Sequence, residues 1–142
     1  MLGSKSNTLI KNVFIAKGVS VTVVSEDEKC RDAIKLMKVH GYDQIPVVKA
    51  NKPREMLGMI TVSDIMAKIS ADNATLDCPV NKVLLSKYPS LKSNESMEKL
   101  VKLLRFNPYV VIVEEFGVDQ HHIAALLTHI DILDYLSQFD SA

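Results

Sequence analysis

The chain repeats itself once, and this internal repeat limits the folds open to it more than any other feature of the sequence. Two copies of the pattern T-x-x-D begin at Thr61 and Thr128, and their aspartates are Asp64 and Asp131, so both offsets are 67 residues (128 − 61 and 131 − 64). Self-similarity at one fixed offset is typical of a chain built from copies of one structural unit. Without any gap, the same offset pairs Glu28 with Glu95, Lys35 with Lys102, Leu36 with Leu103, Tyr42 with Tyr109, Ile45 with Ile112 and Ile65 with Ile132.

Each half has the same predicted order of elements: strand, helix, strand, strand, helix. The strands are short and rich in β-branched residues, the helices carry an apolar stripe at helical spacing, and Gly41 is typical of a helix C-cap. The first half is predicted as a strand at 21–24, a helix from 25–28 to Gly41, strands at 45–48 and 56–60 around a turn at 51–53, and a helix at 61–70. The second half is predicted as a strand at 90–91, a helix at 94–105, strands at 109–113 and 123–127 around a turn at Gly117, and a helix at 128–139.

These elements predict an α+β fold made of two tandem repeats. A three-stranded sheet with helices on one face buries little surface by itself. Two such units that face each other through their sheets share a core, and pseudo-two-fold packing leaves two related clefts at the seam, each lined by both halves. We expect an N-terminal linker at residues 1–18, a first repeat at 19–76 and a second repeat at 77–142.

Composition argues against several classes of function. Lys plus Arg and Asp plus Glu number 17 each, so the formal net charge is zero, whereas binding to nucleic acid or to an anionic membrane favours excess positive charge. No apolar run approaches the ~18 residues of a membrane span, and the N-terminus lacks a secretory signal pattern. Cys30 and Cys78 form no disulfide framework and are expected to be reduced thiols, which favours a cytoplasmic protein.

The T-x-x-D segments are the first candidates for ligand chemistry. A threonine at a helix N-cap brings its hydroxyl to free backbone N–H groups, and the aspartate three residues later brings a carboxylate to the same end. Such a carboxylate accepts hydrogen bonds from the vicinal hydroxyls of a ribose. The alternative is a capping box in which Asp replaces Glu and no ligand is involved. Two copies at equivalent positions, each after an apolar strand, favour a site.

A second candidate is the loop at 41–46, whose side chains would rim a cleft; the alternative is a plain helix-to-strand loop with a half-buried tyrosine. Catalysis has little support, because the sequence has no nucleophile elbow, P-loop or glycine-rich dinucleotide turn. His121 and His122 are adjacent in a predicted strand and point to opposite faces, which makes a poor metal site. We therefore expect a binding module without catalytic residues or a metal.

Residues 58–64, Gly-Met-Ile-Thr-Val-Ser-Asp, are similar to the G-h-h-T/S-x-x-D signature of CBS domains, and the tandem repeat from about Val19 to Phe139 resembles a Bateman module. Segments 41–48, 79–83 and 127–133 resemble the C-terminal regulatory region of eukaryotic cystathionine β-synthases. This resemblance implies an autoinhibitory homodimeric module that binds S-adenosylmethionine as an allosteric ligand. It would act on a pyridoxal-phosphate (PLP) catalytic core, a lyase that joins serine and homocysteine in transsulfuration and cysteine biosynthesis; that core is not part of this sequence.

The resemblance also implies site residues. Thr128 and Asp131 would hold the ribose, and Ser20 and Val21 would line the adenine. The methionyl arm would meet Tyr42, Asp43, Gln44 and Ile45, with Leu126 and Ile130 as apolar walls. A second, related site would use Thr61, Asp64, Val80, Asn107 and Tyr109, and Arg105 nearby would favour a phosphate. Ala125 departs from the signature glycine in the second repeat. Two alternatives stay open: an AMP- or ATP-sensing module of another protein, and a ligand-free assembly module.

Overall fold

The computed structural model describes residues 8–15, 21–115 and 121–140, and the chain packs into two compact units. The first-repeat unit is Thr22–Tyr88, and the second-repeat unit joins Pro89–Ala142 to the N-terminal segment Met1–Val21. The described part of the N-terminal segment, residues 8–15, therefore packs with the second repeat, although it precedes the first repeat in the chain. The sequence predicts domain limits at residues 1–18, 19–76 and 77–142. These limits describe the repeats and not the packing units, and they remain a prediction.

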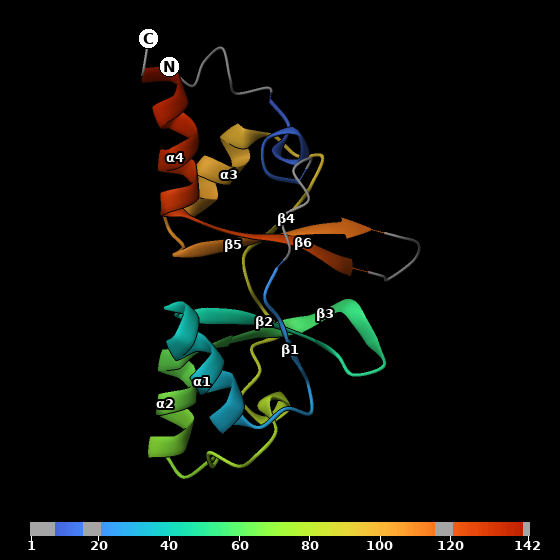
Figure 1. Ribbon diagram of the computed structural model, residues 1–142, viewed down its shortest axis with the longest axis vertical. Coiled ribbons are helices and arrows are strands. Elements are labelled where there is room, and N and C mark those ends of the chain that lie inside the picture. Colours follow the sequence, from blue (N-terminus) through green and yellow to red (C-terminus); the bar gives the residue numbers. More distant parts are fainter. Residues whose placement is uncertain (1–7, 16–20, 116–120, 141–142) are drawn as a thin grey trace. The chain divides into compact units, whose positions relative to one another are not determined.

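The first-repeat unit is a three-stranded sheet with two helices, and both helices lie on one face of the sheet (Figure 1). Strand β1 runs parallel to β2, and β2 runs antiparallel to β3. A short 3₁₀ turn, η3, follows the second helix along the chain. The elements are β1 (Val24–Ser25), α1 (Cys30–His40), β2 (Gln44–Lys49), β3 (Lys52–Thr61), α2 (Val62–Ser70) and η3 (Val80–Lys82).

The second-repeat unit has the same topology, with β4 parallel to β5 and β5 antiparallel to β6. Its first helix begins at Met97 and its second at His129, so each lies 67 residues after its counterpart in the first-repeat unit. The predicted α+β class and tandem repeat are thus confirmed. The elements are η2 (Lys11–Ile15), a single π-helical turn, followed by β4 (Ser90–Lys92), α3 (Met97–Leu104), β5 (Tyr109–Glu115), β6 (His121–Thr128) and α4 (His129–Asp140).

The first helix of each repeat begins later than predicted. Helix α1 begins at Cys30 and α3 at Met97, because the acidic residues before them stabilise a turn instead. The Glu28 carboxylate accepts the Ser25 N–H at 3.3 Å, and the Glu95 carboxylate accepts the Lys92 N–H at 2.8 Å. Likewise, the hairpin turn predicted at 51–53 is shorter, since β3 already begins at Lys52. Gly41 is the predicted C-cap of α1, with a left-handed φ of 70°.

Both first helices receive a backbone partner at their N-termini from a distant segment. Residues 8–11 and 76–81, which we call the clamp segments, pair with the turns before α3 and α1. The Met97 N–H donates to the Thr8 carbonyl at 2.8 Å, and the Cys30 N–H donates to the Cys78 carbonyl at 2.9 Å. Such N-terminal N–H groups have no partner within their own helix. Each clamp segment precedes one repeat in the chain and stabilises the other.

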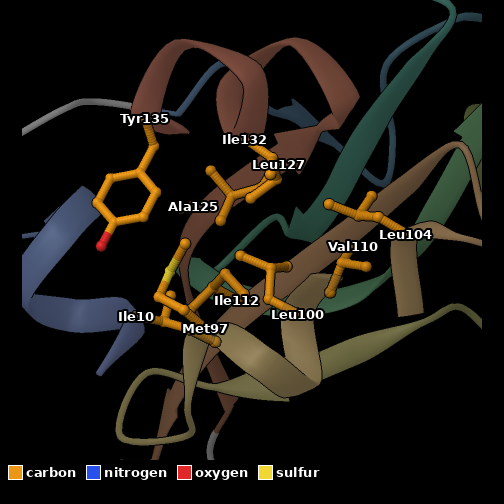
Figure 2. Close-up of a cluster of buried hydrophobic side chains, with 10 residues drawn as sticks. All are labelled: Ile10, Met97, Leu100, Leu104, Val110, Ile112, Ala125, Leu127, Ile132 and Tyr135. Carbon is orange, nitrogen blue, oxygen red and sulfur yellow. The ribbon is translucent and has the colours of Figure 1, made fainter. Parts of the chain in front are cut away.

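Each clamp segment also contributes to a hydrophobic core. Ile10 is fully buried in the core of the second-repeat unit, among side chains from α3, β5, β6 and α4 (Figure 2). Val80 is equally buried in the core of the first-repeat unit. The latter core comprises Val24, Cys30, Ala33, Met37, Ile45, Val47, Ile60, Ile65, Val80 and Val83.

Gly58, the signature glycine, is explained by a close approach of the chain to itself. A Cβ placed on Gly58 would lie 2.3 Å from the Leu85 carbonyl oxygen, and the neighbouring Met59 exchanges two backbone hydrogen bonds with Leu85, at 2.8 and 2.9 Å. We expect Gly58→Ala to lower the free energy of unfolding by about 1–3 kcal/mol, the usual cost of overpacking, and to speed amide hydrogen exchange at Met59 and Leu85.

The matched control for Gly58→Ala is Gly41→Ala. A Cβ placed on Gly41 meets no atom within 4 Å, so this substitution lowers the stability only because the backbone at Gly41 is left-handed, by about 1–2 kcal/mol. Urea denaturation measures both costs, and hydrogen exchange separates them. Unchanged exchange at Leu85 in Gly58→Ala would contradict the close-approach explanation.

The turn before α3 predicts a pH dependence of stability. The hydrogen bond from the Lys92 N–H, with a smaller contribution from Lys99, lowers the pKa of the Glu95 carboxyl below its usual 4.5, against the opposing effect of burial. A carboxylate with a lowered folded pKa stabilises the fold above its unfolded pKa, and this contribution is lost as the pH falls through the folded pKa. We expect Glu95→Gln to be less stable than wild type at neutral pH and to lose less stability below about pH 4.5.

Urea midpoints at neutral and acidic pH test this prediction. Glu98→Gln is the control, since in the described part of the chain Glu98 forms only an exposed pair with Lys102, at 3.1 Å, and such pairs contribute little. Parallel pH profiles for wild type and Glu95→Gln would overturn the prediction.

Candidate functional site

The two T-x-x-D segments begin α2 and α4, as predicted, and both carry capping hydrogen bonds. At α2, Thr61 Oγ1 accepts the Asp64 N–H at 3.1 Å, and the Thr61 hydroxyl donates to Asp64 Oδ2. At α4, Asp131 Oδ2 accepts the Thr128 N–H at 2.8 Å and the Thr128 hydroxyl at 3.3 Å. The two repeats thus use opposite halves of a capping box.

These hydrogen bonds use only one carboxylate oxygen of each aspartate. Every hydrogen bond of the Asp64 and Asp131 carboxylates goes to Oδ2, and Oδ1 of each has no hydrogen-bond partner among the residues that the structure describes. Both side chains are half-buried at the start of a helix, where the macrodipole stabilises a negative charge. Capping and ligand binding, weighed as alternatives from the sequence, are therefore chemically compatible.

In the first-repeat unit, the loop after α1 lies beside the T-x-x-D segment. Gln44 pairs with Thr61 across β2 and β3, and the Val62 N–H donates to the Asp43 carbonyl at 3.0 Å. The exposed Tyr42 ring stacks on His40 with their centroids 5.1 Å apart, a neighbour that the sequence analysis missed although it lies two residues away. We call Tyr42, Asp43, Gln44, Thr61 and Asp64 the first-repeat rim.

The second-repeat unit has an equivalent arrangement, the second-repeat rim, made of Asn107, Tyr109, Thr128 and Asp131. Tyr109 pairs with Thr128 across β5 and β6. The Asn107 amide donates to the Leu103 carbonyl at 2.9 Å, which holds the loop after α3. His129 Nε2 contacts the Leu104 carbonyl oxygen, so it joins α4 to the last residue of α3; its position inside T-x-x-D gave no signal for this role.

The structure sorts the predicted site residues by unit. Tyr42, Asp43 and Gln44 lie with Thr61 and Asp64, whereas Thr128 and Asp131 lie with Asn107 and Tyr109. The two predicted sites, each drawing on both repeats, stay a prediction. Ile45 and Val80 are fully buried in the first-repeat core, so the structure leaves neither residue exposed to a ligand. Val21 and Leu126 are half-buried, Tyr109 is buried, Ile130 and Arg105 are exposed, and Ser20 lies outside the described residues.

Within residues 8–15, 21–115 and 121–140, no group of three or more His, Cys, Asp or Glu side chains is arranged to hold a metal ion. His121 lies at the start of β6, 3.9 Å from the Glu115 carboxylate. None of the helices in this part of the chain has the length and apolar character needed to cross a membrane.

Comparison with known proteins agrees with this architecture. Residues 16–71 match the family model of the CBS domain. The crystal structure of CbpB in complex with c-di-AMP has a TM-score of 0.77 and 17% identity, covering 95% of this chain and 88% of that one. A CBS domain-containing protein of unknown function from Bacillus anthracis has a TM-score of 0.73 and 21% identity, covering 95% and 96%. The fold is therefore that of CBS-domain proteins.

The family-model match falls on the first repeat, and the second repeat has the same topology. Among curated relatives, cystathionine beta-synthase of Dictyostelium discoideum is 25% identical over 132 residues, 89% of this chain. The match covers 24% of that protein, so the chain spans about a quarter of the length of this relative.

The opposite halves of the capping box predict opposite responses to alanine substitution. We expect Thr61→Ala to cost about 1 kcal/mol of stability, a typical N-cap loss, because the Asp64 N–H loses its acceptor. Thr128→Ala should cost less, since the Thr128 N–H keeps Asp131 as its acceptor. For the aspartates the order should reverse, with Asp131→Ala costing more than Asp64→Ala. Urea denaturation of the four variants measures this pattern, and equal costs at matched positions would refute it.

Proposed function

We propose that the chain is an effector-binding regulatory module for an adenosine-containing small molecule, with S-adenosylmethionine as the ligand. The observation that carries this proposal is the Oδ1 atom of Asp64 and of Asp131, which has no hydrogen-bond partner in the described part of the chain, while Oδ2 accepts the Thr61 hydroxyl in Asp64 and the Thr128 N–H in Asp131. A carboxylate in this position accepts the vicinal hydroxyls of a ribose. CbpB, whose fold is similar, was crystallised with c-di-AMP, a ligand built from two adenosine units.

The loop at residues 41–46 favours S-adenosylmethionine over a nucleotide as the ligand. Asp43 is exposed beside the stacked rings of His40 and Tyr42. A carboxylate and an aromatic face both attract the sulfonium and ammonium groups of this ligand, whereas a phosphate favours cations such as Arg105. In the proposed site, Thr128 and Asp131 hold the ribose, and Tyr42, Asp43 and Gln44 meet the methionyl arm.

The similarity to cystathionine beta-synthase supports a PLP-dependent catalytic core as the partner of this module. The lyase chemistry belongs to that core, and this chain contributes autoinhibition and its relief, as a homodimer. A ligand shifts such an equilibrium only when it binds one arrangement of the module better than the other. The regulatory role therefore requires a difference in affinity between the active and inactive enzyme.

Isothermal titration calorimetry with S-adenosylmethionine, ATP, AMP and c-di-AMP tests the ligand. We expect saturable binding of S-adenosylmethionine, weakened about 10- to 100-fold in Asp131→Asn, because a hydrogen bond to a charged group contributes about 1.5–3 kcal/mol. Asparagine keeps an acceptor for the Thr128 N–H, so the cap survives. Asp134→Asn is the control, since it removes an exposed charge from the same helix.

Each result separates the alternatives. Binding of ATP or AMP without S-adenosylmethionine would indicate a nucleotide sensor. No binding of any of the four compounds would leave a ligand-free assembly module and would refute the proposed site. If Asp64→Asn weakens binding and Asp131→Asn does not, the occupied site is the second one.

A further inference from the structure

Two cysteines that are distant in the sequence lie in contact in the first-repeat unit. Cys30 is the first residue of α1 and is buried, and Cys78 lies in the clamp segment and is half-buried. Their Sγ atoms are 3.6 Å apart. We propose that this pair is a redox modification site, at which the two thiols form a reversible disulfide that links the clamp segment at residues 76–81 to α1.

The backbone already holds the two residues in place. The Cys30 N–H donates to the Cys78 carbonyl at 2.9 Å, and the adjacent residues Lys29 and Pro79 form an antiparallel bridge. A disulfide bond is ~2.05 Å long, so closing it requires the sulfur atoms to approach by roughly 1.5 Å. Small side-chain rotations supply such a movement, and the backbone pairing is kept.

The reaction balances with a small-molecule disulfide such as oxidised glutathione as the oxidant. The thiolate of one cysteine attacks a sulfur of the oxidant, forms a mixed protein–glutathione disulfide and releases one glutathione thiolate, which takes up a proton. The second cysteine loses its proton and attacks the protein sulfur of that mixed disulfide, which releases the second glutathione. Two protein thiols are oxidised, and one oxidised glutathione is reduced to two thiols.

Burial sets the order of the two steps. Cys30 begins a helix, a position that lowers thiol pKa values, yet burial, with a contribution from its hydrogen bond to Cys78, raises the pKa of the Cys30 thiol to about 11. Cys78 is partly accessible to solvent. Cys78 therefore captures the oxidant, and Cys30 resolves the mixed disulfide.

The disulfide would add a covalent bond to a contact that now depends on backbone hydrogen bonds and on the buried Val80 side chain. Around it, the clamp segment is held by backbone hydrogen bonds and by an exposed ion pair between Arg31 and Asp77, at 3.2 Å, and such pairs contribute little. The crosslink closes the chain between residues 30 and 78, a long loop whose closure restricts the unfolded state. This site needs no effector and goes beyond the proposed function.

The test treats the reduced, folded chain with excess oxidised glutathione and follows intact mass, free thiols and thermal unfolding. We expect the mass to fall by two hydrogen atoms, both thiols to disappear, and one peptide pair, containing Cys30 and Cys78, to be linked. The unfolding midpoint should rise on the order of 10 °C and return on treatment with dithiothreitol. The chain unfolded in urea, treated identically, confirms that the oxidant is competent.

Two single variants keep the result interpretable. Cys30→Ala should retain one glutathione on Cys78, and Cys78→Ser should react slowly or not at all, and neither should show the rise in the unfolding midpoint. Persistent free thiols in the folded wild type, a glutathione adduct that is never resolved, or disulfides between two chains would each overturn the proposal. A disulfide that forms without raising the midpoint would overturn its role as a fastening of the clamp segment.

Discussion

The start of each first helix depends on a carbonyl group from outside its own repeat. The N–H groups of a first helical turn have no partner within the helix, and leaving them unpaired in a buried place is costly. Thr8 supplies this carbonyl to Met97, and Cys78 supplies it to Cys30. The same clamp segments insert Ile10 and Val80 into the cores. Without them, the helices that cover each sheet would lose both their N-terminal partners and part of the apolar surface beneath them.

At the other end of each repeat, one aspartate has a structural role that is compatible with the ligand-binding role proposed for it. Its Oδ2 atom stabilises the helix start, and the structure leaves its Oδ1 atom without a partner in the described part of the chain. The cap fixes the carboxylate in one rotamer, so a ribose would meet an oxygen that is already positioned, and little side-chain entropy would be lost on binding. Stability and affinity can be separated by asparagine, which keeps the capping acceptor, but not by alanine.

The sequence predicted features that leave a local pattern. The 67-residue repeat, the order of elements, the helix starts at Thr61 and Thr128 and the C-cap at Gly41 were all readable, because each depends on neighbouring residues. The clamp segments were not, since backbone carbonyls have no side-chain signature and Cys30 and Cys78 lie 48 residues apart. The signature glycine was recognised as a motif residue, but the sequence did not show that the group approaching Gly58 is the Leu85 carbonyl. The residues of the two rims were predicted only in part from the sequence, because strand register determines which loop lies beside which helix.

The crossed clamp segments bear on how such a chain arises. A single repeat with its own leading segment cannot stabilise its own first helix in this way, because that segment belongs with the other repeat. Two separate copies would have to exchange these segments, as the subunits of domain-swapped dimers do, and the resulting dimer would dissociate on dilution. Fusion of the two copies into one polypeptide makes the exchange intramolecular, at a fixed effective concentration, so duplication converts a concentration-dependent assembly into a property of a single molecule.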